Sequence, residues 1–195
     1  HNTLVVDRTS HFGGDWRAGE EHPTEPLFFE TGPDFGIMSA RMPYAYDGVV
    51  FTRTLLRLGG YMFQHPLVLD VLKVESADTH RYELPLYYQG HITNISHPVQ
   101  ANTDSMAPLG DSNGYQHLWM RARAAADGDR PLQVTFLNDD RFYTWSTLAS
   151  QGTEMLFTEL GATDPEFNLR RDQGLMLNVP SAANHTFISV FEPHG

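Results

Sequence analysis

The sequence predicts an all-β fold, an antiparallel β-sandwich of two sheets. About ten or eleven short apolar segments are separated by turn signals, which is the spacing expected of a sandwich. No segment keeps the helical period of about 3.6 residues over several turns. Hydrophobic residues make up 41% of the 195 positions and aromatic residues 12%, which is enough to fill a core. We therefore expect residues 1–195 to form one domain.

The chain opens with HNTLVVD (His1–Asp7), which predicts a strand because Leu and Val favour the pleated state. A histidine in first place, with nothing like a leader, indicates the later part of something longer. Arg8–Gly32 is rich in Gly, Glu, His and Pro and is predicted to be a long surface loop of the kind that carries function. The alternative is a solvated loop in which Phe12 and Trp16 are packing plugs.

Strand patterns then follow one another up to residue 88. In chain order they are Phe35–Met42, Val49–Leu58, Leu67–Val74 and His80–Tyr88. Pro43–Gly48 is predicted to be a turn with an Asp-Gly hairpin signal after the first, and Gly59-Gly60 ends the second. Ala77-Asp78 is a short polar link, so we expect the last two strands to pair as a hairpin.

The second half begins with a predicted long loop, Ile95–Asn113, which has little periodicity. The strands predicted after it are Tyr115–Ala124, Leu132–Leu137, Arg141–Leu148, Glu154–Leu160, Gly174–Val179 and His185–Phe191. Turns are expected at Asp127–Asp129 and Asn138–Asp140, and a turn or short helical turn at Asp164–Asn168.

The formal net charge of −11 and the absence of cysteine exclude several classes of protein. A nucleic-acid binder would usually be basic, and an acidic domain binds an anion only through a local cluster of Arg, Lys or His. Without cysteine there is no disulfide, zinc–thiolate site or thiol nucleophile, which fits a reducing compartment. No apolar run approaches a membrane span, so we expect neither nucleic acid nor membrane as a partner.

Metal and hydrolase sites have weak support. Jelly-roll metal enzymes use a His-x-His pair, and none occurs in this sequence. Asp70 and His80 could approach each other across the predicted hairpin, but two ligands without a third are weak evidence for zinc, and both also fit as ordinary polar strand residues. A Ser-His-Asp triad stays open, although no G-x-S-x-G elbow is present. A glycosidase needs two facing carboxylates, and among 24 acidic residues some pair will always fit, so this signal does not distinguish a glycosidase.

β-Elimination from a uronate polymer suits the many His and Tyr residues better. In that reaction a cationic or hydrogen-bonding group neutralises the C5 carboxylate, a base removes the C5 proton and an acid protonates the leaving oxygen. His and Tyr can both donate and accept protons. His1, Arg8, His11 and Arg17 form a locally cationic segment in an acidic protein, although solvated loop charges explain the arginines equally well.

Five segments, taken in order, resemble a known family. His1–Asp7 resembles the corresponding segment of the heparinase II/III-like polysaccharide lyases. The other four are similar, more narrowly, to the oligoalginate lyases of polysaccharide lyase family fifteen: His80–Gly90 (HRYELPLYYQG), Gly114–Trp119 (GYQHLW), Phe167–Arg171 (FNLRR) and Phe191–Gly195 (FEPHG). The matches run from the first residue to the last.

The resemblance implies an N-terminal α/α-toroid followed by an antiparallel β-sandwich, with the substrate cleft between them and the catalytic Tyr on the toroid. This chain would be the sandwich alone, so its implied partners are the missing N-terminal α/α-toroid domain and a uronate-containing acidic polysaccharide or oligosaccharide. His1 matches the sandwich histidine that faces the cleft and neutralises the carboxylate or shuttles protons. In the isolated chain an untethered His1 would be disordered and without a role.

Some relatives hold a structural zinc in the sandwich, but three ligands cannot be placed in this sequence. In some of them the position of Tyr87 or Tyr88 is His, so no metal or other cofactor is assigned to this chain.

The leading hypothesis is therefore the β-sandwich part of an alginate or oligoalginate lyase, with His1 catalytic and with Arg8 and His11 in contact with substrate. Alone, the chain should be inactive. The alternative is a non-catalytic carbohydrate-binding or scaffold sandwich. That function needs an exposed aromatic row, such as one made of Tyr87, Tyr88, Trp119 or Trp145, whereas strand alternation more simply buries these side chains. A jelly-roll metalloenzyme is a third possibility and would require bound metal.

Overall fold

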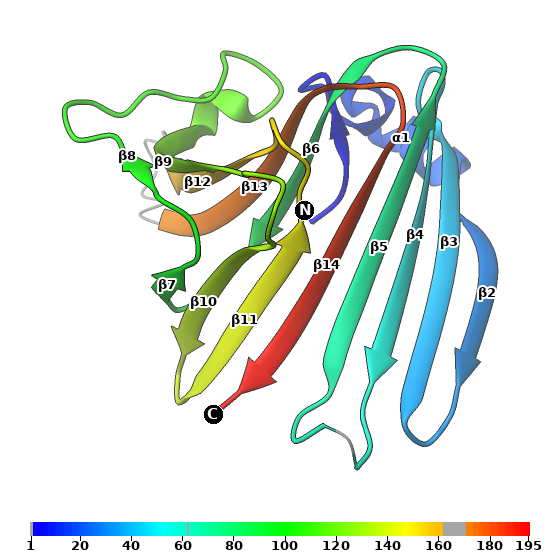
Figure 1. The fold of residues 1–195 in the computed structure, drawn as a ribbon. Coiled ribbons are helices and arrows are strands. Elements are labelled where there is room, and N and C mark those ends of the chain that lie inside the picture. The colour runs from blue at the N-terminus through cyan, green and yellow to red at the C-terminus, as the bar shows by residue number, and fades with distance from the viewer. Residues whose placement is uncertain (1, 62, 162–170) are drawn as a thin grey trace.

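The computed structural model describes residues 2–61, 63–161 and 171–195, and these form two antiparallel sheets packed face to face (Figure 1). One sheet has six strands, in the order β1 (Val5–Val6), β6 (His80–Tyr87), β13 (Arg171–Ala182), β12 (Glu154–Gly161), β9 (Leu118–Ala125) and β8 (Gln100–Ala101). The other has eight, in the order β2 (Glu25–Thr31), β3 (Phe35–Tyr46), β4 (Val49–Leu58), β5 (Leu67–Ser76), β14 (His185–His194), β11 (Arg141–Leu148), β10 (Leu132–Asn138) and β7 (His91–Ile95). The predicted sandwich is confirmed.

The main core lies between the two sheets and is filled by the side chains that the two sheets direct toward each other. On β6, Tyr82 and Leu84 point into this core, while Glu83 between them points to the opposite face of the six-stranded sheet. From the eight-stranded sheet, Leu72 of β5 and Phe187 of β14 meet them.

A second, smaller apolar cluster lies on the opposite face of the six-stranded sheet. Its buried members are Tyr115, Leu118, Leu156 and Met176. Tyr115 belongs to the 3₁₀-helix η2 (Tyr115–His117), which ends the long connection between β8 and β9. This connection therefore covers part of the face that would otherwise be bare, and it brings residues near position 115 close to the start of the chain.

The predicted loop Arg8–Gly32 is wrong in part. It contains the 3₁₀-helix η1 (His11–Gly14), the helix α1 (Trp16–Glu21) and the edge strand β2. The carboxylate of Asp15 caps α1 by accepting from the backbone N–H groups of Arg17 and Ala18, at 2.9 and 3.4 Å. The strand β2 lacks an alternating pattern because it is held by backbone pairing to β3, and Phe29 on it is 72% exposed.

The predicted hairpin of 67–74 with 80–88 is also wrong. The strand β5 pairs with β4 and β14, whereas β6 lies in the other sheet between β1 and β13. Four consecutive residues of β6, Tyr82–Pro85, are buried, which indicates a strand covered on both faces. The short polar link therefore carries the chain from one sheet to the other.

Other boundaries differ by a few residues. The first strand is reduced to β1, while β3 runs on to Tyr46, so that its turn is only Asp47-Gly48. The predicted loop Ile95–Asn113 contains β8, and the strand β7 before it was missed. The predicted turn Asp164–Asn168 lies outside the described residues. None of the helices in the described part of the chain has the length and apolar character needed to cross a bilayer.

Candidate functional site

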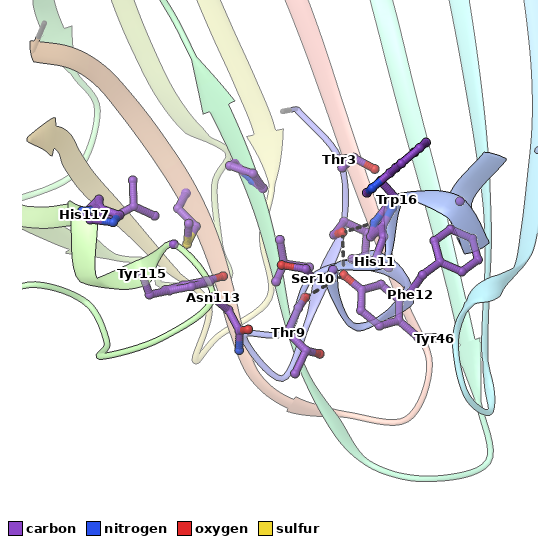
Figure 2. A pocket seen from close by; sticks show the side chains of 18 of the residues that line it. Thr3, Thr9, Ser10, His11, Phe12, Trp16, Tyr46, Asn113, Tyr115 and His117 are labelled. Atoms are coloured by element: carbon purple, nitrogen blue, oxygen red, sulfur yellow. Dashed lines mark hydrogen bonds between the residues drawn. The ribbon is translucent and has the colours of Figure 1, made fainter. Parts of the chain in front are cut away.

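A cavity of about 690 Å³ lies beside the second apolar cluster, between the start of the chain and the end of the β8–β9 connection. We call it the lateral cavity. Residues 3–5, 9–12 and 14–16 form one wall, and residues 113–115, 117 and 118 form the other. Figure 2 shows Thr3, His11 and Trp16 on one side, and Asn113, Tyr115 and His117 across from them. Pro85 of β6 and Met176 of β13 belong to its floor. Its volume falls in the range of about 300–1,000 Å³ typical of small-molecule sites.

The first wall is folded back on itself by a tight turn at Asp7-Arg8. The N–H of Thr9 donates to the carbonyl oxygen of Val6 at 2.9 Å, and the two central residues have φ values of 49° and 58°. Non-glycine residues in this left-handed region are strained. The turn persists because both side chains are held by other parts of the fold.

Arg8 is held by a buried carboxylate. Its Nε donates to Oε1 of Glu83 at 3.3 Å, and its Nη1 donates to the carbonyl oxygen of Leu109 at 2.5 Å. The guanidinium also lies over the Tyr115 ring, 5.3 Å from the centroid. The Tyr115 hydroxyl donates to Oε2 of Glu83 at 2.5 Å, and the Glu83 side chain is fully buried. Arg8, Glu83 and Tyr115 thus form a network that joins the two walls of the cavity.

This network also affects the titration of its tyrosine. Burial raises the pKa of the Tyr115 hydroxyl, and the neighbouring Glu83 carboxylate raises it further. Tyr115 therefore stays protonated across the physiological range and acts in the network as a donor, not as a base.

Asp7 is held from the other side by the start of β6. One carboxylate oxygen accepts from Nδ1 of His80 at 2.7 Å, and the other accepts from the backbone N–H of Arg81 at 2.8 Å. Partial burial works to raise the pKa of Asp7, but the hydrogen bonds from His80 and Arg81 outweigh it, so the pKa lies below its ordinary value of 3.8. The ionised carboxylate is therefore the form that the fold prefers.

We expect the hydrogen bonds of Asp7 to make the free energy of unfolding depend on pH in the acid range. Because the folded-state pKa of Asp7 is lowered, its contribution is complete above pH 3.8 and is lost as the pH falls through the folded-state pKa. Urea unfolding between about pH 6 and about pH 3 should show a smaller loss of stability in Asp7→Asn than in the wild type. Asp140→Asn, at an exposed position, is the matched control. Equal acid sensitivity in the wild type and Asp7→Asn would contradict this.

His11 lies in the middle of the first wall and contacts Tyr46. Its Nε2–H donates to the carbonyl oxygen of Leu4 at 2.8 Å, which leaves Nδ1 as the acceptor of the neutral ring. The Tyr46 hydroxyl donates to the same oxygen at 3.2 Å and to that of Thr9 at 3.1 Å. The two rings meet edge to face at 5.1 Å (Figure 2). Burial raises the pKa of Tyr46, so this hydroxyl is also a donor and not a base.

Of the residues predicted to be functional, His11 lines the cavity, Arg8 adjoins that wall in sequence but is not among the residues that line it, and His1 lies outside the described residues. Its neighbour Asn2 is fixed to both sheets. The carbonyl oxygen of Asn2 accepts from Nη1 of Arg53 on β4 at 2.6 Å, and its side-chain oxygen accepts from the N–H of Tyr87 on β6 at 3.0 Å.

Sequence reasoning missed the opposite wall of the cavity. Asn113 and His117 reach it from about one hundred residues further along the chain, and no local pattern announces that approach. The Asn113 side chain donates to the carbonyl oxygen of Arg8 at 3.1 Å, which fixes the two walls together. Trp16 lies inside the loop predicted to carry function, and the alternative in which it only packs against the fold is wrong, because Trp16 is 66% exposed.

The pair Asp70 and His80 does not form a metal site. Asp70 accepts two hydrogen bonds from Arg53, at 2.9 and 2.5 Å, and His80 contacts Asp7. Across residues 2–61, 63–161 and 171–195, no group of three His, Asp or Glu side chains is arranged to hold a metal ion. The described residues therefore do not fit the structural zinc that the family resemblance raised, nor a jelly-roll metal centre.

The exposed aromatic row required by a sugar platform is also not present among the four side chains proposed for it. Tyr87 is the last residue of β6 and lines the lateral cavity, whereas Tyr88, which follows the strand, packs against the main core. Trp145 on β11 is only 5% exposed and belongs to the main core. Trp119 is half-buried on β9.

Comparison with known proteins finds one family and two curated relatives that match along the chain. The model of the family "Heparinase II/III-like, C-terminal" matches residues 1–188. An alginate lyase of Stenotrophomonas maltophilia is 45% identical over the whole chain, and an exo-oligoalginate lyase of Saccharophagus degradans is 43% identical. The chain spans only 26% and 27% of these two relatives.

Solved structures show the same fold. A heparinase III matches the whole chain with a TM-score of 0.63 at 12% identity, and the heparan sulfate lyase HepC of Pedobacter heparinus matches it with 0.57 at 13%. The chain covers 24% of each. The resemblance seen in the five sequence segments is confirmed at the level of the family and of alginate-lyase relatives.

Proposed function

This chain belongs to the heparinase II/III-like C-terminal family, and from that membership we propose that it is the sandwich part of a polysaccharide lyase that cleaves alginate or oligoalginate by β-elimination. The observation that carries the proposal is similarity along the entire chain to two proteins named as alginate and oligoalginate lyases. The solved structures of heparinase III and heparan sulfate lyase share the fold at low identity.

The proposed lyase has two parts, because the chain spans about a quarter of the length of its curated relatives. We propose that residues 1–195 form one domain and that an N-terminal α/α-toroid supplies the catalytic Tyr. The lateral cavity and the start of the chain would then face the substrate from the sandwich side. This division agrees with the properties of Tyr46 and Tyr115, whose hydroxyl protons are held by carbonyl or carboxylate acceptors inside the sandwich.

The chemistry assigns three roles. A group must neutralise the C5 carboxylate so that the C5 proton becomes acidic, a base must remove that proton, and an acid must protonate the oxygen that leaves C4. We propose that His1 acts on the carboxylate or on the transferred proton. Asn2, which follows it, is held by both sheets, so the chain enters the fold from a defined point.

Among the other two predicted residues, we propose that His11 contacts the substrate, since it lines the cavity. The guanidinium of Arg8 donates to Glu83 and to the Leu109 carbonyl. We therefore propose that Arg8 acts on substrate binding mainly by holding the wall on which His11 lies.

The proposal is tested by comparing the 195-residue chain with the full-length lyase. Formation of the unsaturated product is followed by ultraviolet absorbance with oligomannuronate, oligoguluronate, heparan sulfate and a neutral cello-oligosaccharide. We expect the full-length protein to act on the alginate oligomers and the 195-residue chain alone to be inactive. Activity of the chain alone would exclude the division of the site, and binding without cleavage by the full-length protein would favour a carbohydrate-binding module.

A further inference from the structure

Trp16 stands out because it is a large aromatic side chain exposed at the edge of a cavity. It is 66% exposed, whereas Trp145 in the core is only 5% exposed. It lines the lateral cavity from the first turn of α1, and Figure 2 shows it beside Thr3. Exposing an indole to water forgoes the gain from burying it, so an occupant that covers the ring would be favoured.

Arg17 adds a positive charge next to this indole. Its guanidinium carbon lies 5.4 Å from the centroid of the Trp16 ring. Within the described residues no carboxylate forms an ion pair with the Arg17 side chain. In a chain with a formal net charge of −11, a cation that lies beside the Trp16 ring and forms no ion pair with a carboxylate of the described residues is a local exception that can attract an anion.

The rest of the cavity lining includes several side chains that can form hydrogen bonds. Ser10, His11, Asn113 and His117 line the two walls that face each other in Figure 2. Asp15 also lines the cavity, but its Oδ1 accepts from the N–H groups of Arg17 and Ala18, which offsets its charge locally. An apolar ring, a cation and convergent polar groups are together suited to a sugar that carries a carboxylate, because a pyranose has apolar faces and a polar edge.

We propose that the lateral cavity is a binding subsite for one uronate residue of the substrate chain, in which the Trp16 indole stacks on the sugar ring and Arg17 attracts its carboxylate. The inference rests on the proposed function for the class of ligand, and it adds a site and two residues to it. Trp16 and Arg17 are binding residues in this proposal, and they do not take part in proton transfer.

The kinetic test uses the full-length lyase acting on oligouronates. Trp16→Ala should raise KM about 10-fold with kcat within about twofold, since removing a stacked aromatic costs roughly one factor of ten in affinity. Trp16→Phe should lie between wild type and Trp16→Ala. Arg17→Gln should raise KM at low salt and lose most of the salt dependence of KM, because exposed charges are screened. The matched controls are Tyr61→Ala and Arg141→Gln, both exposed and outside the cavity lining, and neither should change KM.

A direct binding test uses the 195-residue chain and its tryptophan fluorescence. Oligouronate should quench the fluorescence saturably, and Trp16→Ala should lose this response. A neutral oligosaccharide of equal length should give none at the same concentrations. Thermal unfolding of each variant, followed by circular dichroism, establishes that the fold is unchanged.

The outcomes separate the two proposals. A wild-type lyase that is active while Trp16→Ala keeps its kcat and KM would overturn the subsite and leave the function standing. A fall in kcat with unchanged KM would also overturn it, because the ring would then act through packing. If the full-length protein has no lyase activity, the proposed function fails, and saturable quenching that depends on Trp16 still decides whether the cavity binds uronate.

Discussion

Replacing Glu83 with alanine is expected to lower the free energy of unfolding by about 3–5 kcal/mol. The carboxylate is fully buried and accepts from Arg8 at 3.3 Å and from Tyr115 at 2.5 Å. Its removal leaves a guanidinium and a buried hydroxyl without their acceptor. The Arg8 side chain is 34% exposed and can regain some water, which favours the lower end of this range.

Urea unfolding of the purified chain measures this change. Glu83→Gln keeps the shape and an acceptor for Tyr115 but removes the charge, so its loss should be smaller, about 1–3 kcal/mol. Glu75→Ala is the control, because Glu75 is half-exposed and pairs with Lys73 at the surface, where such pairs are worth about 0–1 kcal/mol. A loss below about 1 kcal/mol in Glu83→Ala would show that the network does not support the fold.

The second large effect is expected from His1→Ala in the full-length lyase. If His1 neutralises the carboxylate or moves the proton, its loss should lower kcat/KM by about 10²–10⁴-fold. The free energy of unfolding should stay unchanged. His1→Gln separates the two roles, since an amide can donate a hydrogen bond to the carboxylate but cannot exchange a proton near neutral pH.

The pH profile of kcat identifies which role applies. Rescue by His1→Gln with a flat profile around neutral pH would assign His1 to the carboxylate. No rescue, with a lost titration between about pH 5 and about pH 8, would assign it to proton transfer. His91→Ala, at an exposed position on β7, is the control. Normal turnover in His1→Ala would remove His1 from the mechanism.

Local patterns in the sequence predicted most strands, because alternation and turn residues act over a few neighbours. Leu132–Leu137, Arg141–Leu148 and the Asn138–Asp140 turn between them are reproduced almost residue for residue by β10 and β11. The same rules failed for the pairing of β5 with β6. The choice of sheet for β6 depends on burial of both of its faces by distant segments, and a link of a few residues cannot encode this.

The candidate site shows the same limit. The first wall could be proposed from the His, Arg and Trp residues concentrated in residues 8–17, although no local pattern signals the strained turn at Asp7-Arg8. The second wall could not be proposed from the sequence, because no local pattern marks Asn113 or His117 as part of a site. The glutamate that joins the walls, Glu83, is one acidic residue among 24, and only its burial distinguishes it.

The long reach of the Arg8 contacts has a consequence for the order of folding. Arg8 is separated from Glu83 by 75 positions and from Leu109 by 101. Contacts of such high sequence separation close large loops, and their entropic cost is met only after shorter loops have formed. The walls of the lateral cavity should therefore be assembled late, after the local hairpins, and a ligand that fills the cavity would report on chains that have completed their folding.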